Sequence, residues 1–409
     1  MKILVFGINY YPELTGIGKY TAEMCAWLAK QHHHVSVITA MPYYPEWKIH
    51  SLYQHRLWHT ETIDGVVVQR CPLYVPKKVS GVKRMIHEFS FLLSSSIYWI
   101  KALFQTHDVV ICISPPFHLG FMVWVYKVIK NTPVIYHIQD LQVDAARNLG
   151  ILKNETLLTV LEKCERFILH RMTKVSSLSD GMKQNILKKG IDENDYFNLP
   201  NWVDTDFIKP ISKEGSLKAE LGYHQGDRIV LYSGNMGEKQ GLEIVLEVAE
   251  LLKGESNIHF LFVGEGASKQ RMQEYAVEKQ LTNVKFKNLL PYEQLPLLLA
   301  VADIHLVIQK GLASDLMLPS KLLGILSSGG LAMVTAVQGT SLYNIIKDHD
   351  AGVVIMPEST EALLLAIKEY IFKDNLTQKA NARNYALNEL NINKILQKFE
   401  SKLNSISQR

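Results

Sequence analysis

Short apolar runs of strand length alternate with longer amphipathic segments through the first half of the chain. Segments 21–31 and 117–130 show helical periodicity. Strands are expected at Lys2–Ile8, Val35–Ala40, Val66–Arg70, Val109–Ser114 and Val134–Ile138. Near-continuous apolar strands separated by helices are typical of a parallel sheet covered on both faces.

The alternation stops at the sequence L-P-N-W-V-D-T-D-F-I-K-P, which begins at Leu199, and restarts after it. Further strands are expected at Ile229–Ser233, Ile258–Val263, Val284–Lys287, Ile304–Gln309, Leu331–Thr335 and Val353–Ile355. A chain of 409 residues also exceeds the size of a single hydrophobic core. The pattern therefore predicts an α/β fold with two Rossmann-like domains, 1–200 and 201–385, facing across a cleft. Residues 386–409 are expected to form a C-terminal helix that packs back on the first domain.

Composition narrows the class of protein. With 47% hydrophobic and 21% charged residues the chain is globular, and a net charge of +4 without a polybasic tail argues against nucleic acid as a partner. The four cysteines form no C-x-x-C pair, so we expect buried free thiols in a reducing cytoplasm. No apolar run reaches the roughly 18 residues of a membrane span.

Two glycine-bearing turns each follow a strand and lead into a helix. The first contains Gly16 and Gly18, and the second, S-G-N-M-G-E-K-Q-G, contains Gly234, Asn235 and Lys239. Such turns present backbone N–H groups to an anion, and the lysine adds a full positive charge, so together they suit a substrate with phosphates. For the first turn, tight packing is an alternative role. It lacks G-x-G-x-x-G and no acidic residue ends the second strand, which disfavours a nicotinamide-dependent oxidoreductase.

Polar residues gather at two other predicted strand ends. His137 ends a strand and precedes Asp140, although a buried structural histidine would also fit this position. Asp315 and Lys321 precede a later helix, where the first would bind hydroxyl groups and the second a negative charge. We expect Asp204 to cap the chain in the linker rather than to bind a metal, and we predict no metal site.

An ordered set of motifs covers almost the whole chain: T-G-I-G-K-Y, H-I-Q-D, L-P-N-W-V-D, S-G-N-M-G-E-K-Q-G, F-V-G-E-G and L-P-S-K. With these motifs the chain resembles the retaining glycosyltransferases of family four, which have the GT-B fold. The segments G-I-N-Y-Y-P-E-L-T-G-I-G-K-Y, V-I-T-A-M-P-Y-Y-P-E-W and R-C-P-L-Y-V-P make it most similar to the colanic-acid type of fucosyltransferase. Other exopolysaccharide enzymes are similar as well.

The resemblance implies an activity. A sugar would pass from a nucleoside-diphosphate sugar, with GDP-fucose preferred, to a hydroxyl of a lipid-linked oligosaccharide in exopolysaccharide or capsule synthesis. The reaction would retain the anomeric configuration and use neither metal nor cofactor. The alternatives are a UDP-sugar-dependent glycosyltransferase, a GT-B epimerase and a non-catalytic protein that binds sugar nucleotides.

The resemblance also assigns roles to residues. The turn at Gly16 would approach the donor diphosphate, His137 would contact the transferred sugar and Lys239 would clamp the phosphates. The loop that begins at Gly264 and Glu265 would lie along the nucleotide. Asp140 is our candidate to orient either the acceptor hydroxyl or the histidine.

The sequence departs from the family pattern at two places. Gly324 stands where the family has the second of two glutamates, and the first falls near Leu316, beside Asp315. Asn235 stands where relatives often carry an arginine, and Lys321 is expected to compensate.

The stretch from Lys77 to Phe104 places Lys77, Lys78, Lys83 and Arg84 ahead of an apolar, aromatic-bearing helix. This pattern suits an interfacial helix on anionic lipid, and it equally suits a domain helix with a basic solvated end. A lipid-carried acceptor favours peripheral contact with the inner face of the cell membrane, on the cytoplasmic side.

Overall fold

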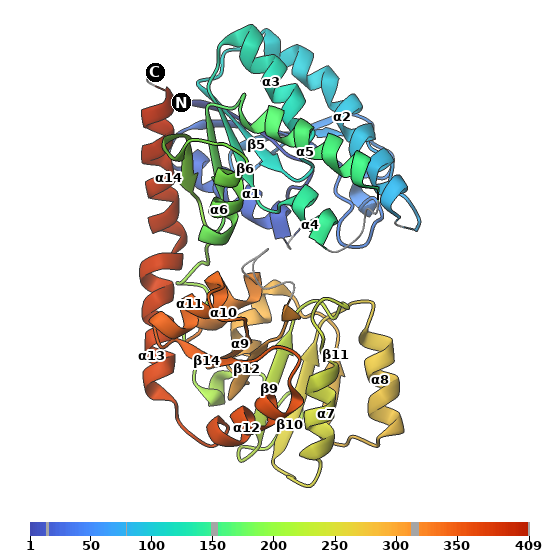
Figure 1. The fold of residues 1–409 in the computed structure, drawn as a ribbon, viewed down its shortest axis with the longest axis vertical. Coiled ribbons are helices and arrows are strands. Elements are labelled where there is room, and N and C mark those ends of the chain that lie inside the picture. The colour runs from blue at the N-terminus through green and yellow to red at the C-terminus, as the bar shows by residue number, and fades with distance from the viewer. Residues whose placement is uncertain (14–15, 79, 149–153, 312–318, 408–409) are drawn as a thin grey trace. The chain divides into compact units, whose positions relative to one another are not determined.

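The computed structural model describes residues 1–13, 16–78, 80–148, 154–311 and 319–407. The chain divides into two compact units, both of α/β type (Figure 1). Unit 1 comprises Met1–Pro200 and the C-terminal residues from Ile395, and unit 2 comprises Asn201–Lys394.

Unit 1 is built on an eight-stranded sheet in the order β3-β4-β2-β1-β5-β6-β7-β8. Its strands are β1 (Lys2–Phe6), β2 (His34–Ala40), β3 (His59–Ile63), β4 (Val66–Cys71), β5 (Val109–Ser114), β6 (Val134–Ile138), β7 (Lys174–Ser177) and β8 (Tyr196–Asn198). All neighbours are parallel except β3 and β4. The five predicted strands are confirmed. The other three were missed because β3 is a polar edge strand, β7 (K-V-S-S) has a single apolar residue and β8 has three residues.

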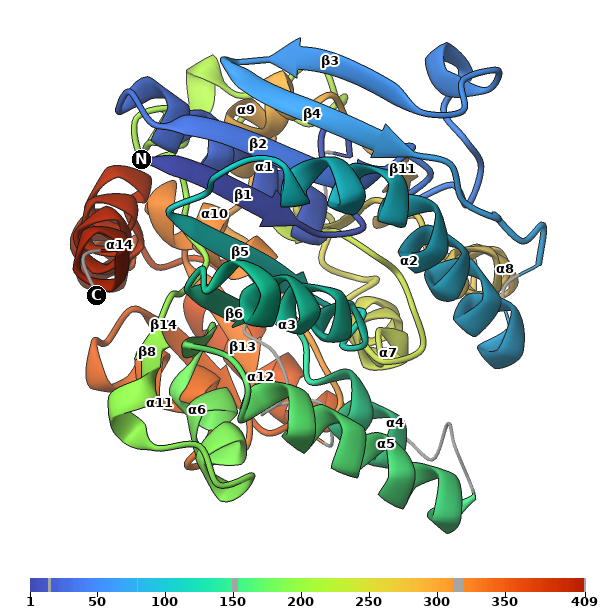
Figure 2. The ribbon, with the colours of Figure 1, turned by 90° about the horizontal axis from the view of Figure 1, so that it is seen from above.

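Helices cover both faces of this sheet. They are α1 (Gly16–Lys30), α2 (Gly81–Leu103), α3 (Leu119–Lys130), α4 (Gln142–Asn148), α5 (Glu155–Leu169) and α6 (Asp180–Lys188). Helix α2 contacts β2 and β4, and α3 contacts β5 and β6 (Figure 2). Phe6 of β1 packs against Phe91 and Trp99 of α2, with ring centroids 5.5 and 5.1 Å away. Its neighbour Val5 points to the opposite face and is also fully buried.

The last helix, α14 (Ile392–Ser407), packs on unit 1 from Ile395 onward. Phe399 stacks on Phe197 of β8, and Glu400 lies 2.8 Å from the Nε2 atom of His33. Residues 386–390, which we predicted to begin this helix, form a separate π-helical turn in unit 2.

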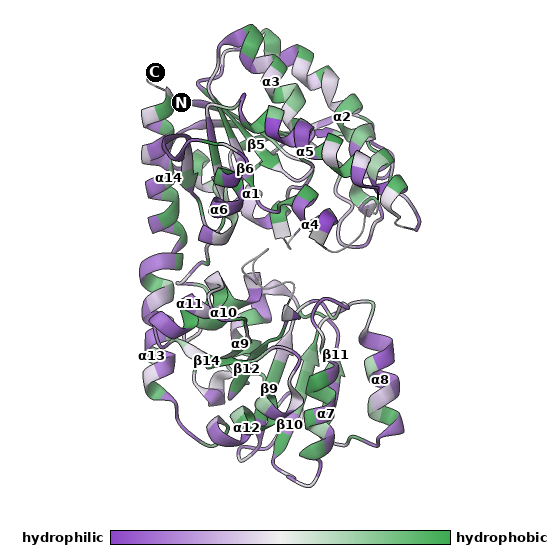
Figure 3. Ribbon diagram, in the orientation of Figure 1, coloured by the Kyte–Doolittle hydropathy of each residue, from purple (hydrophilic) through white to green (hydrophobic). Residues whose placement is uncertain are grey.

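Unit 2 contains a fully parallel sheet in the order β11-β10-β9-β12-β13-β14. The strands are β9 (Arg228–Ser233), β10 (Ile258–Val263), β11 (Val284–Lys287), β12 (Ile304–Val307), β13 (Ala332–Thr335) and β14 (Gly352–Ile355). They agree with all six predicted strands and are largely hydrophobic (Figure 3). The helices are α7 (Glu243–Leu251), α8 (Lys269–Glu278), α9 (Leu295–Leu299), α10 (Ser320–Ser327), α11 (Ser341–Asp348), α12 (Thr360–Tyr370) and α13 (Leu376–Tyr385).

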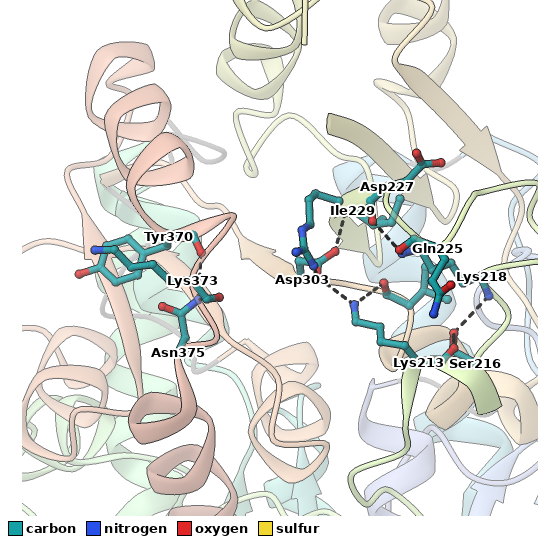
Figure 4. Close-up of polar contacts among 12 residues, drawn as sticks. Lys213, Ser216, Lys218, Gln225, Asp227, Ile229, Asp303, Tyr370, Lys373 and Asn375 are labelled. Carbon is teal, nitrogen blue, oxygen red and sulfur yellow. Dashed lines mark hydrogen bonds and ion pairs between the residues drawn. The ribbon is translucent and has the colours of Figure 1, made fainter. Parts of the chain in front are cut away.

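A polar network fixes the amino-terminal end of β9 (Figure 4). Asp303 accepts hydrogen bonds from the Ile229 backbone N–H at 2.8 Å and from Arg228 at 3.4 Å, and it pairs with Lys213 at 3.2 Å. Lys218 donates to two backbone carbonyls nearby. Ligands in such sheets bind at the carboxyl ends of the strands, so this network is structural.

Two smaller predictions concern the linker and the cysteines. The Asp204 carboxylate caps the chain as expected, accepting from the backbone N–H groups of Asp206 and Phe207. All four cysteines are free, but only three are buried, because Cys164 is partly exposed.

In the described part of the chain, no helix combines the length and the apolar character needed to cross a bilayer.

Candidate functional site

A cavity of about 240 Å³ lies in unit 1 where the direction of strand succession reverses. The chain continues from β1 to β2 on one side and reaches β5 on the other, and such switch points are where open α/β sheets bind ligands. The lining comes from six segments: Ile8 and Asn9 after β1; Gly16 and Ile17 of α1; Tyr43, Tyr44 and Trp47 after β2; Arg84, His87 and Glu88 of α2; Pro115 and Pro116 after β5; and Asp140 after β6.

The cavity brings Gly16 and Asp140 together, whereas Gly18 has a packing environment. A Cβ atom at Gly18 would lie 3.0 Å from the Cβ atom and 3.1 Å from the Oε2 atom of Glu13. The Glu13 carboxylate accepts hydrogen bonds from the backbone N–H groups of Tyr43 and Tyr44, and burial raises its pKa. The tight-packing role that we considered for the first turn therefore fits Gly18, and the sequence analysis had missed Glu13.

His137 ends β6 but does not line the cavity. It is 2% exposed, and its Nδ1 atom lies 3.0 Å from the Ser176 hydroxyl oxygen of β7. Burial lowers the pKa of His137 to about 3, so the ring is neutral at physiological pH. It can make hydrogen bonds there, but it cannot serve as a cationic group.

One wall of the cavity is formed by α2, for which the sequence predicted either an interfacial helix or a domain helix with a basic solvated end. Arg84 donates to the Glu88 carboxylate at 2.9 Å, and Gln142 approaches the same carboxylate at 3.3 Å. Burial raises the pKa of Glu88. The sequence does place Arg84 and Glu88 one turn apart on this helix. It could not show that they line a cavity, because Gln142, which approaches Glu88, is distant in the chain.

In unit 2, two glycine loops stack at the carboxyl ends of β9 and β10. Gly234 and Gly264 have φ values of +139° and +149°, and a Cβ atom on Gly264 would lie 2.0 Å from the Gly234 carbonyl oxygen. A Cβ atom on Gly266 would lie 2.4 Å from the Met236 carbonyl oxygen. Met236 also donates its N–H to the Glu265 carbonyl at 2.8 Å. Both loops are thus held in place by backbone contacts that only glycine permits.

Lys321, in the first turn of α10, points its ammonium group at the first of these loops. Its Nζ atom is buried without a hydrogen-bond partner in the described parts of the chain. The same atom lies 3.6 Å from the centroid of the Tyr232 ring and 3.2 Å from where a Cβ atom of Gly234 would be. Burial lowers the pKa of Lys321 to about 7. A buried cation without a counter-charge is costly, and such groups are enriched at functional sites.

Asn235 and Lys239 lie exposed in the same loop. Lys310 donates its backbone N–H to the Lys239 carbonyl at 3.1 Å, and Glu238 binds Ser268 and Arg271 at 3.1 Å each. These contacts hold the loop at both sides of Lys239. The Glu265 carboxylate, by contrast, pairs with Lys269 at 2.8 Å.

The glutamate positions of the family pattern do not offer a carboxylate here. Asp315 and Leu316 lie outside the described residues. A Cβ atom at Gly324 would lie 3.6 Å from the side chains of Ile208 and Leu299, so this position faces apolar groups inside unit 2. In the part of the chain that the structure describes, no three histidine, cysteine, aspartate or glutamate side chains converge as a metal site would require.

Gln309 was not predicted. It follows β12, the neighbour of β9 across the switch point of unit 2, and its Nε2 atom is buried without a hydrogen-bond partner within the described residues. Its backbone N–H and carbonyl both bind the Thr335 hydroxyl, at 2.7 and 2.8 Å. Gln309 thus offers a fixed donor at the edge where Gly234 and Lys321 lie. An isolated glutamine at a strand end gives no sequence signal.

Comparison with known proteins gives matches over both units. Residues 15–202 match the glycosyl transferase 4-like domain, and residues 214–387 match the glycosyl transferases group 1 family. The putative colanic acid biosynthesis glycosyl transferase WcaI of Escherichia coli (strain K12) is 39% identical over 408 residues, which cover 98% of each chain.

Solved structures with the same fold cover the chain at low sequence identity. Sucrose-phosphate synthase from Thermosynechococcus elongatus superposes with a TM-score of 0.74 at 17% identity, over 99% of this chain and 98% of that one. Anabaena HepE, solved in complex with UDP and glucose, gives a TM-score of 0.73 at 13% identity, over 99% of this chain and 100% of that one. The two parallel-dominated α/β units thus form a GT-B fold.

Proposed function

The chain belongs to the group 1 and 4-like glycosyltransferases, and from this premise we propose that it transfers a sugar from a nucleoside-diphosphate sugar to a lipid-linked oligosaccharide. The proposal rests above all on Lys321, whose buried ammonium group faces the Gly234 loop without a partner among the described residues. A donor diphosphate would supply the missing negative charge. GDP-fucose is the preferred donor, and the reaction retains the anomeric configuration.

The proposed reaction requires stabilisation of the negative charge that develops on the departing nucleoside diphosphate. Lys239 and Lys321 provide two cations, and the backbone N–H of Asn235 would add partial positive charge. The Gly234 N–H already donates to the Val263 carbonyl at 2.9 Å. Gly264 and Glu265 border this loop and would lie along the nucleotide. These charges would stabilise the leaving diphosphate without a metal ion. Asp315 is the proposed hydrogen-bond partner of the donor hydroxyl groups.

In unit 1, the neutral His137 would hydrogen-bond the transferred sugar of the donor. Asp140, in the wall of the unit 1 cavity, would orient the acceptor hydroxyl. Gly16 begins α1 at this cavity, and its turn would approach the donor phosphates beside the acceptor sugar, not inside the cavity. No protein nucleophile is required, because a donor phosphate oxygen can accept the proton of the acceptor on the same face.

The pathway is proposed from the relative WcaI, whose name refers to colanic acid biosynthesis. We propose a role in the synthesis of an exopolysaccharide or capsule. A UDP-linked donor is the second candidate, supported by the UDP in the HepE structure. An epimerase is a further alternative. A non-catalytic binding protein is another, because Gly324 replaces the second glutamate of the family.

A thermal-shift screen with GDP, UDP, ADP, NAD and their common sugar conjugates tests the donor class. One nucleoside diphosphate, at a hundred times its Kd, is expected to stabilise the protein by about 2.7 kcal/mol and to raise the Tm by a few degrees. The shift should be the same with magnesium and with EDTA. A shift with NAD alone, or with none of these compounds, would contradict the proposal.

Membrane contact is proposed from the outer face of α2. Apolar side chains recur on that face at helical spacing, at Val82, Ile86, Phe89, Leu93, Ile97, Ile100 and Phe104. They are well exposed, with Leu93 at 73% and Phe104 at 87%. Lys77, Lys78 and Lys83 are exposed beside the start of this stripe. A stripe of this kind with adjacent lysines fits the interface of an anionic bilayer.

Liposome flotation tests this contact. The protein is expected to float with vesicles containing anionic phosphatidylglycerol and to stay in the soluble fraction with neutral phosphatidylcholine. Replacing Leu93 and Ile100 by glutamate should abolish flotation. The matched control is Leu365→Glu on α12, an exposed leucine of unit 2 outside the stripe. Wild-type protein that stays soluble with anionic vesicles would rule the contact out.

A further inference from the structure

The unit 1 cavity contains an aromatic group that the proposed reaction does not use. The rings of Tyr43, Trp47 and His87 contact one another, with centroids 5.4 Å apart for Tyr43 and Trp47, 4.4 Å for Tyr43 and His87, and 5.2 Å for Trp47 and His87. All three residues line the cavity. Rings of this kind offer an apolar face with defined geometry, which suits the C–H face of a pyranose.

Trp47 is held in a conformation that bulky residues rarely adopt. Its φ is +51°, in the left-handed region. Its ring nevertheless packs against the core of unit 1 next to Tyr43. Outliers of this type persist where the surrounding structure fixes them, and they are concentrated at ligand-binding sites.

His87 supplies a buried hydrogen-bond acceptor without a partner. The side chain is fully buried, and its Nδ1 atom lies 2.6 Å from the Tyr74 carbonyl oxygen. Because a carbonyl only accepts, Nδ1 carries the proton. Burial lowers the pKa of His87, so the ring is neutral and Nε2 bears a lone pair. Nε2 has no partner among the described residues, and a ligand hydroxyl would satisfy it.

The charges around the cavity disfavour a phosphate as its occupant. Glu88 and Asp140 are both in the lining, and the Glu13 carboxylate is bound to the backbone of Tyr43 and Tyr44 in the same wall. The cationic side chain of the lining, Arg84, is already paired with Glu88 at 2.9 Å. A neutral, hydroxyl-rich ligand therefore suits a cavity with these carboxylates better than an anion does.

We infer that this cavity binds a neutral hexopyranosyl unit of the acceptor, with one sugar face on Trp47 and Tyr43 and its hydroxyl groups on His87, Glu88 and Asp140. The inference rests on the proposed function, which supplies the acceptor. Helix α2 supports the assignment, since it lines the cavity with His87 and Glu88 and exposes Leu93 and Ile97 on its outer face. A saccharide attached to a membrane lipid would reach the cavity along this helix.

Saturation-transfer difference NMR on the full chain tests the inference. The probes are methyl α-glucopyranoside, methyl α-galactopyranoside, methyl α-mannopyranoside and, as the anionic comparison, methyl α-glucuronide. At least one neutral methyl hexoside is expected to bind, and the glucuronide to bind less tightly. Trp47→Leu should raise the Kd of the neutral probe about tenfold, the effect of removing one well-packed aromatic contact. His87→Phe, which removes the lone pair and keeps a ring, should raise it by a similar factor.

Trp58→Leu is the matched control. Trp58 is another partly exposed tryptophan of unit 1, it does not line the cavity, and its substitution should leave the Kd unchanged. Thermal denaturation checks that each variant is folded. If only one of Trp47→Leu and His87→Phe melts as the wild type does, that variant alone is sufficient for the comparison.

Three results would overturn the inference: no binding of any neutral hexoside at 50 mM, a Kd unchanged in the folded cavity variants, or displacement of the probe by GDP or UDP. The last result would assign the cavity to the donor phosphates instead. Failure of the proposed function would look different, because the hexosides would still bind while no nucleotide raised the Tm.

Discussion

Lys239→Ala is expected to lower kcat by two to three decades. The side chain lies in the loop that follows β9, and in the proposed reaction it meets charge that develops on the leaving diphosphate. A preorganised charged or hydrogen-bonding group of this kind is worth about 3 to 4 kcal/mol in the transition state. Because Lys239 is exposed, the substitution should leave the Tm within about one degree of the wild type.

Steady-state transfer with the preferred donor measures this effect. Lys253→Ala is the matched control, since Lys253 is an exposed lysine of the same unit that donates to the Lys279 carbonyl. The control should retain full activity. A Lys239→Ala enzyme with near-normal turnover would remove Lys239 from the site.

Lys321→Met is expected to lower activity by about two decades and to make the unliganded protein more stable. The loss follows from removing the buried cation beside Gly234. The stability rises because methionine fills a similar volume and carries no charge that must be removed from water on folding. Opposite effects on activity and stability distinguish a ligand-binding cation from a structural one.

The stability gain should depend on pH in a defined direction. The pKa of Lys321 falls from an ordinary value of 10.5 to about 7 on folding, so between these values the unfolded chain binds the additional proton. Because of Lys321, the free energy of unfolding therefore rises with pH across this window, by up to about 1.4 kcal/mol per pH unit. The advantage of Lys321→Met should be largest at pH 7 and should disappear towards pH 10.

Urea unfolding of both proteins from pH 7 to 10 measures that difference. Lys347→Met, at an exposed lysine of α11, is the control and should show no such dependence. If Lys321→Met destabilised the protein at pH 7 and kept full activity, Lys321 would be a structural residue.

Much of the fold could be predicted because buried parallel strands carry continuous apolar runs, and the L-P-N-W-V-D linker interrupts them. The glycine loops of unit 2 could be predicted as well, since Gly264 allows a backbone approach that no other residue permits and Gly234 has a φ of +139°. The polar strand β3 could not, because an edge strand has no strong hydrophobic pattern.

The cavity of unit 1 could not be predicted either. Trp47 lies after β2 and His87 lies in α2, and only the packing of the helix over the sheet brings their rings within 5.2 Å. The burial of Lys321 is likewise a tertiary effect. Lysine at the start of a helix is ordinarily solvated, whereas here the Tyr232 ring and the Gly234 loop enclose it.

The most direct test of the account is transfer of radiolabelled sugar into the butanol-extractable lipid of a membrane preparation that carries the acceptor. The purified protein would be incubated with GDP-fucose and the common UDP-sugars in the presence of EDTA. The account predicts that label from one donor moves into the lipid fraction, and that Lys239→Ala and Lys321→Met reduce the rate by the factors given above. No transfer from any donor, or equal transfer by the wild type and both variants, would contradict it.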